Sequence, residues 1–84
     1  MTNITLHNQT ELKTQALIFL GQRLAHICLV APGETCFLAK VSGPYDIFLK
    51  NGATGWEMAR ALDSRASDLT LTKQKGGWFQ ITTR

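Results

Sequence analysis

The sequence predicts a mainly β fold, a small antiparallel β-sandwich or barrel built from six to eight short strands. Apolar and polar residues alternate along most of the chain, as in Ile4–His7, which is typical of strands with one buried face. Glycine and proline interrupt this alternation at nearly regular spacing. No segment is long enough to provide the helical crossovers that a parallel sheet requires.

The length of 84 residues predicts a single domain over residues 1–84. The 44% hydrophobic and 18% charged residues indicate a globular chain rather than a disordered one. The longest apolar runs, Ala16–Leu20 and Ile27–Ala31, are far shorter than the ~20 residues of a membrane span. The N-terminus has no basic cluster followed by an apolar stretch, so no signal peptide is expected. We therefore expect a cytoplasmic protein or a mature, processed form.

Strands are expected wherever β-branched and large apolar residues alternate between turn signals. These segments are Ile4–His7, Gln15–Leu20, Leu24–Val30, Thr35–Val41, Tyr45–Lys50, Leu69–Lys73 and Trp78–Thr83. Gln15–Leu20 is apolar at almost every position, which indicates a strand covered on both faces. Pro32 presets the first dihedral of a type II turn, and Gly33 accepts the positive φ that follows. Asn51-Gly52 is typical of a hairpin.

The segment Trp56–Leu62 fits two structures. Its residues from Glu57 onward are good helix formers, and Thr54 with Glu57 matches a capping box. The strand–turn–strand rhythm on either side favours a strand. A strand is therefore the prediction, and one short helix near residues 55–62 is the alternative.

Three turns in succession resemble those of a known group of sandwich modules. They are Gly21-Gln22-Arg23, Ala31-Pro32-Gly33-Glu34 and Gly43-Pro44-Tyr45-Asp46-Ile47, each placed between strands. Over roughly residues 16–50 this order is similar to that of PEGA and transthyretin-like β-sandwich modules. The resemblance implies a sandwich fold and a role in adhesion, carbohydrate binding, the cell envelope or spacing. It implies no individual site residue.

The two cysteines flank the Pro32-Gly33 turn, and three interpretations of them are open. In a hairpin with a two-residue loop, Cys28 and Cys36 point to opposite faces of the sheet. A three-residue loop places them directly opposite each other, within reach of a disulfide bond. Free, buried thiols that act as small hydrophobic residues are the favoured interpretation. A disulfide is the second, and a metal site of His26, Cys28 and Cys36, completed by His7, is the third.

No catalytic motif is present. The chain lacks a G-x-S-x-G elbow, a Walker glycine loop, an H-E-x-x-H pair and a C-x-x-C pair. Nothing in the sequence fixes the separation between carboxylates that acid–base catalysis requires. We therefore predict that the protein is not an enzyme and carries no cofactor.

Aromatic residues beside turns are the better candidates for binding, since binding residues gather on loops held by a rigid scaffold. The predicted ligand-binding residues are Tyr45, Asp46, Asn51, Trp56 and Trp78. Tryptophan and tyrosine combine a flat apolar face with a hydrogen-bonding edge, which suits a sugar ring or a protein surface. The alternative is that both tryptophans fill the ends of the sandwich. The other aromatic residues of strand interiors, Phe19, Phe37 and Phe48, are expected in the core.

These observations favour a non-enzymatic binding or assembly module, which recognises a glycan or a protein surface through loop aromatics or a strand edge. An open strand edge can also pair with a second copy to form a homo-oligomer. The first alternative is a small nucleic-acid-binding barrel, in which the last two strands form a basic and aromatic pair. Its basic and aromatic residues would be Lys73, Lys75, Trp78, Phe79 and Arg84. The second alternative is the metal site described above.

Overall fold

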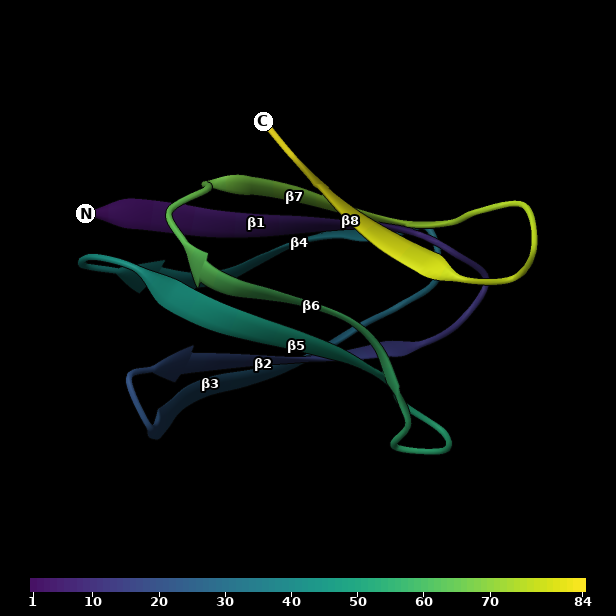
Figure 1. Ribbon diagram of the computed structural model, residues 1–84, viewed down its shortest axis with the longest axis horizontal. Helices are drawn as coiled ribbons and strands as arrows, with labels where there is room; N and C mark the ends of the chain where they lie inside the picture. Colours follow the sequence, from purple (N-terminus) through teal and green to yellow (C-terminus); the bar gives the residue numbers. More distant parts are fainter.

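The computed structural model describes all 84 residues and contains eight strands and no helix (Figure 1). In chain order the strands are β1 (Thr2–Gln9), β2 (Thr14–Leu20), β3 (Arg23–Val30), β4 (Thr35–Val41), β5 (Tyr45–Asn51), β6 (Glu57–Ser64), β7 (Asp68–Lys73) and β8 (Phe79–Thr83). Every predicted strand is present. The ambiguous segment forms β6, so the helix alternative is wrong.

The strands form two four-stranded sheets, which makes the fold a sandwich rather than a barrel. Sheet A has the order β4-β1-β7-β8, and sheet B has the order β3-β2-β5-β6. All pairs are antiparallel except β1 and β7, which run parallel. This pair departs from the purely antiparallel prediction because β7 reaches β1 from β6 in the other sheet. No hairpin joins β1 to β7, so no tight turn forces them to run antiparallel.

The connection between β3 and β4 contradicts the predicted cysteine hairpin. The two strands lie in different sheets, so neither register considered for Cys28 and Cys36 applies. The turn between them crosses from sheet B to sheet A and takes its backbone partners from β1. Gly33 N–H donates to the Asn8 carbonyl at 2.8 Å, and Asn8 N–H donates to the Glu34 carbonyl at 2.9 Å. Gly33 has φ 74°, as the predicted turn requires.

The core lies between the sheets and is formed mainly by every second residue of the inner strands, with four residues from the edge strands β3 and β4. Thirteen hydrophobic residues are buried there: Ile4, Leu6, Ala16, Ile18, Val30, Leu38, Ala39, Val41, Tyr45, Ile47, Leu49, Leu69 and Leu71. The alternation that predicted the strands thus also separates the inner from the outer face of each sheet.

Asn8 is the polar centre of one end of this core. Its amide nitrogen donates to the carbonyls of Leu12, Val30 and Ala31, at 2.9, 3.2 and 3.2 Å. Its amide oxygen accepts hydrogen bonds from the backbone and the hydroxyl group of Thr10. One buried side chain therefore joins the β1–β2 loop to the end of β3 and fixes the spacing of the two sheets there.

Candidate binding surfaces

The five predicted site residues do not form one site. Tyr45 is only 1% exposed and belongs to the core. Its hydroxyl group donates to the Ala66 carbonyl, and burial raises the pKa of the phenol above its ordinary value. A side chain held in this way offers no surface to a ligand.

Asp46 and Asn51 occupy opposite ends of β5. The Asp46 carboxylate accepts a hydrogen bond from Asp63 N–H at 2.7 Å. This bond holds the β5–β6 bulge, in which Asp63 has φ 52°. The Asn51 side chain instead accepts hydrogen bonds from Ala53 and Thr54 in the β5–β6 loop. Both residues therefore have local structural roles.

Trp56 and Trp78 are 78% and 57% exposed, so the alternative that they fill the ends of the sandwich is wrong. Trp56 lies immediately before β6, and Trp78 lies immediately before β8. The β1–β2, β5–β6 and β7–β8 loops lie at the same end of the molecule, on the right in Figure 1. We call this the loop end. Both indoles are therefore displayed at the loop end.

A continuous apolar surface was not among the predicted sites. It covers the outer side of sheet B, where apolar side chains of β3, β2 and β5 lie next to one another in register. We call this surface the apolar face; it consists of Leu17, Phe19, Leu24, Ile27, Leu29 and Phe48. Phe19 and Phe48 were predicted to lie in the core, but they pair with other outward residues and are only half-buried.

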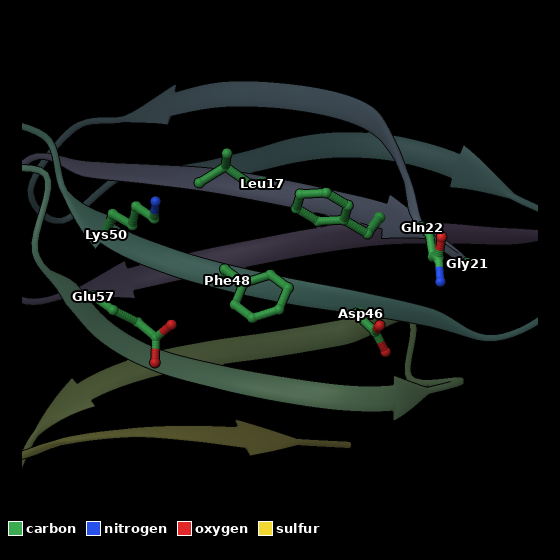
Figure 2. A pocket seen from close by; sticks show the side chains of 8 residues that line it. Leu17, Gly21, Gln22, Asp46, Phe48, Lys50 and Glu57 are labelled. Carbon is green, nitrogen blue, oxygen red and sulfur yellow. The ribbon is translucent and has the colours of Figure 1, made fainter.

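Two aromatic rings form the centre of the apolar face. The rings of Phe19 and Phe48 meet edge to face, with centroids 5.4 Å apart and planes at 85°. The Arg60 guanidinium lies 4.9 Å from the centroid of the Phe48 ring. A shallow hollow of about 410 Å³ lies over Leu17 and these rings (Figure 2). The rings therefore pack against each other and against Arg60, and the surface above them is slightly concave.

Charged residues occupy only part of the border of the apolar face. Along β5, Asp46 and Lys50 lie at opposite ends with Phe48 between them, as Figure 2 shows. On β6, Arg60 forms a two-pronged ion pair with Glu57, with N–O distances of 2.8 and 2.9 Å. Along β3, the outward residues at the border are Leu24, Ile27 and Leu29. No Asp, Glu, Lys or Arg lies between them.

The outer side of sheet A has the opposite character. We call it the polar face, and it consists of Asn3, Thr5, His7, Thr35, Asp68, Thr70 and Thr72 with one apolar residue, Phe37. His7 bonds to the Thr35 hydroxyl on one side and to the Asp68 carboxylate on the other. Phe37, predicted to lie in the core, is 59% exposed because it pairs with the outward residue Thr5.

The cysteines are free, as expected, but they are half-buried rather than buried, and they lie along the edge between the sheets. Cys28 pairs with Ala16 in sheet B, and Cys36 pairs with Leu6 in sheet A. Burial raises the pKa of the Cys36 thiol, and Glu34 and Cys28 add to the shift. No three His, Cys, Asp or Glu side chains are grouped so as to hold a metal ion, so His26 is not joined to the two thiols as a ligand set.

The basic and aromatic residues of the nucleic-acid alternative are also separated. Lys73 lies 5.9 Å from the Phe79 ring at the start of β8. Arg84 follows the other end of β8, where it lies 3.8 Å from the Asp68 carboxylate. These cations do not line one continuous groove.

One sequence signal pointed to the apolar face. The segment of β2 is apolar on both sides, and it was expected to be covered on both sides; the structure covers only the inner one. The fold contains no helix of the length and apolar character needed to cross a bilayer. Comparison of the chain with known protein families, with curated proteins and with solved structures finds no match in any of the three.

Proposed function

We propose that this protein is a non-enzymatic assembly module, and that its apolar face docks against the same face of a second copy. The observation that carries the proposal is the uncovered row of apolar side chains on the outer side of sheet B. Ile27 and Leu29 alone are 53% and 55% exposed on the edge strand β3. Full burial of such a side chain stabilises a structure by about 1.5–3 kcal/mol, so covering this row is favourable.

The character of β3 supports a protein partner. Edge strands of monomeric proteins usually carry outward charges, proline or bulges that prevent association. β3 has a bulge at Ala25, but its outward positions hold Leu24, Ile27 and Leu29 rather than charged residues or proline. A contiguous apolar patch on three neighbouring strands, with a polar border, is typical of protein interaction sites.

The pattern of charges supports a second copy in particular. The outward row of β5 reads Asp46, Phe48, Lys50, with opposite charges placed symmetrically about the ring. A two-fold axis that lies in the interface and crosses the strands at Phe48 places Asp46 of each copy over Lys50 of the other. Such an isologous contact is the commonest arrangement in homo-oligomers. Arg60 lies close to the axis, and its ion pair with Glu57 reduces the repulsion from the second Arg60.

The size of the face indicates the class of interface. Three strands about 4.8 Å apart, each about seven residues long with a rise of about 3.3 Å, give a projected area of about 330 Å². A standard interface buries about 800 Å² of accessible surface per partner. The dimer therefore belongs to the small, reversible class, and we expect it to dissociate at micromolar concentrations.

Sedimentation equilibrium at a series of protein concentrations tests this proposal. We expect the mass to rise from that of the 9.3 kDa chain toward twice that value. In Ile27→Asp the mass should stay at the monomer value, because the charge would be buried without a partner. Phe37→Asp is the matched control, since it changes an equally exposed apolar residue to aspartate on the polar face.

The proposal is wrong if the wild-type protein stays monomeric at millimolar concentration. It is also wrong if Phe37→Asp prevents association while Ile27→Asp leaves it unchanged. Thermal unfolding checks that both variants are folded. We expect a cooperative transition in each, since neither side chain belongs to the core.

A further inference from the structure

A second concave region lies at the loop end, away from the apolar face. It is a cavity of about 360 Å³ between the β1–β2 loop and the β7–β8 hairpin. Its volume lies within the range of pockets that hold small molecules, about 300–1,000 Å³. The cavity is lined by Gln9, Thr10, Glu11, Leu12, Lys73 and Phe79.

The lining combines an apolar wall with hydrogen-bonding groups of both kinds. The Phe79 ring provides the wall, and Lys73 lies 5.9 Å from its centroid. Glu11 supplies an acceptor and Gln9 supplies both donors and acceptors. The charges of Lys73 and Glu11 have opposite signs. This lining suits a neutral ligand that has an apolar face and a rim of hydroxyl groups, whereas a polyphosphate chain would require an excess of positive charge.

Both exposed tryptophans belong to loops near this cavity, although neither side chain lines it. Trp78 belongs to the β7–β8 hairpin, where its carbonyl accepts a hydrogen bond from Gln74 N–H at 2.8 Å. Trp56 ends the β5–β6 loop, and this loop is joined to the β1–β2 loop by a 2.8 Å bond from Gly52 N–H to the Lys13 carbonyl. One indole is therefore carried by the hairpin that lines the cavity, and the other by a loop bonded to the opposite wall.

The loop that carries Trp56 is held in one conformation. The Asn51 side-chain oxygen accepts hydrogen bonds from Ala53 N–H and Thr54 N–H, and the Thr54 hydroxyl oxygen accepts one from Trp56 N–H. At Gly52 a Cβ atom would come within 3.1 Å of the Lys13 side chain, so the two loops are in close contact. A ring presented by such a loop loses little conformational freedom on binding.

We propose that this cavity and the two indoles form a carbohydrate-binding site for a neutral oligosaccharide. One sugar ring lies against Phe79 with its hydroxyl groups bonded to Gln9, Glu11 and Lys73. Neighbouring rings stack on Trp78 and Trp56, whose flat apolar faces match the C–H faces of pyranoses. The site is separate from the apolar face, so it functions in either oligomeric state.

Titration with neutral oligosaccharides tests the site. The probes are hexasaccharides of glucose, N-acetylglucosamine, xylose and mannose, with tryptophan emission and calorimetry as readouts. We expect at least one probe to give a saturable emission change. We expect Trp78→Ala to weaken that binding about tenfold, which corresponds to about 1.4 kcal/mol. Glu11→Ala should weaken it less, and it leaves both fluorophores in place.

The matched control is Phe37→Ala, which removes an aromatic ring of similar exposure on the polar face and should leave binding unchanged. The proposal is overturned if no probe changes the emission at millimolar concentration. It is also overturned if Trp78→Ala binds as tightly as the wild-type protein. Preferential, salt-sensitive binding of oligodeoxythymidylate would equally overturn it, since that result would identify a nucleic-acid site.

Discussion

The outer faces of the two sheets are built on the same plan but have opposite chemistry. On sheet A, the outward positions of β1 and β7 hold threonine, histidine and aspartate, and His7 links Thr35 to Asp68 through its two ring nitrogens. On sheet B, the outward positions of β2 and β3 hold leucine, isoleucine and phenylalanine. Both sheets have four strands and bury the same kind of inner face.

This difference separates the requirements of folding from those of association. The inner faces supply all thirteen buried hydrophobic residues of the core, and none of these residues comes from the outer face of sheet B. The polar face has the composition of a sheet surface in contact with water. The apolar face has the composition of a sheet covered on both sides, and we attribute it to contact with a second copy.

The largest expected effect comes from the core that lies between the two sheets. In Asn8→Ala the carbonyls of Leu12, Val30 and Ala31 lose a buried donor. We expect the free energy of unfolding, measured with urea, to fall by about 3 kcal/mol. Asn3→Ala, on the exposed polar face of the same strand, should change it by less than about 0.5 kcal/mol. Equal unfolding midpoints for the two variants would show that the Asn8 network does not hold the sheets together.

The next effect comes from giving sheet B the chemistry of sheet A. The double variant Leu17→Thr/Phe48→Thr places threonine, a good strand former, at both positions and removes two large side chains from the apolar face. We expect its dimer dissociation constant, measured by sedimentation, to rise at least about a hundredfold, since two apolar contacts are lost in each copy.

The matched control for this variant is Thr5→Ala/Thr70→Ala, which changes two half-buried residues of the polar face. Its association should equal that of the wild-type protein. A monomeric control variant, or a double threonine variant that still dimerises, would place the interface somewhere other than the apolar face.

A smaller effect tests the orientation of the two copies. In Lys50→Glu, two acidic residues face each other across the proposed axis, and in Asp46→Lys two lysines do. We expect each variant alone to dimerise about tenfold more weakly than the wild-type protein. An equimolar mixture should associate more tightly than either variant alone, because opposite charges then meet at both contacts. A mixture that associates no better than its components would rule out this axis.

The smallest effect is that of salt. Raising the salt concentration about tenfold should change the dissociation constant by less than about threefold, because apolar contacts supply most of the affinity and only the Asp46–Lys50 contacts are screened. Sedimentation in low and high salt measures this change. A steep weakening with salt would mean that charges, rather than the apolar face, drive association.

The strands could be predicted from the sequence because alternation is a local property. The segments that were predicted to be strands form β2, β5 and β7, among others. Gly33 has the positive φ that its position in the turn requires. The partners of the strands could not be predicted in the same way. The β3–β4 turn looks like a hairpin because its local residues fit one, but Asn8, more than twenty residues earlier, supplies its backbone partners and directs it across the sandwich.

The candidate sites were harder to predict for the same reason. Tyr45 and Trp56 both lie next to turns, yet one is buried in the core and the other is 78% exposed. Whether an aromatic residue such as Phe37 or Phe48 points inward depends on the register of its strand with a distant neighbour. Only the two-sided apolar pattern of β2 indicated the apolar face in advance.

The most direct test of the account is the proton–nitrogen correlation spectrum of the protein on dilution from millimolar to low micromolar concentration. The spectrum reports each backbone amide separately, so it compares the two outer faces in a single sample. We expect concentration-dependent shifts in β2, β3 and β5, centred on Leu17, Ile27 and Phe48, and unchanged signals at Thr5, His7 and Thr70. Shifts centred on the polar face, or a spectrum that does not depend on concentration, would contradict the account.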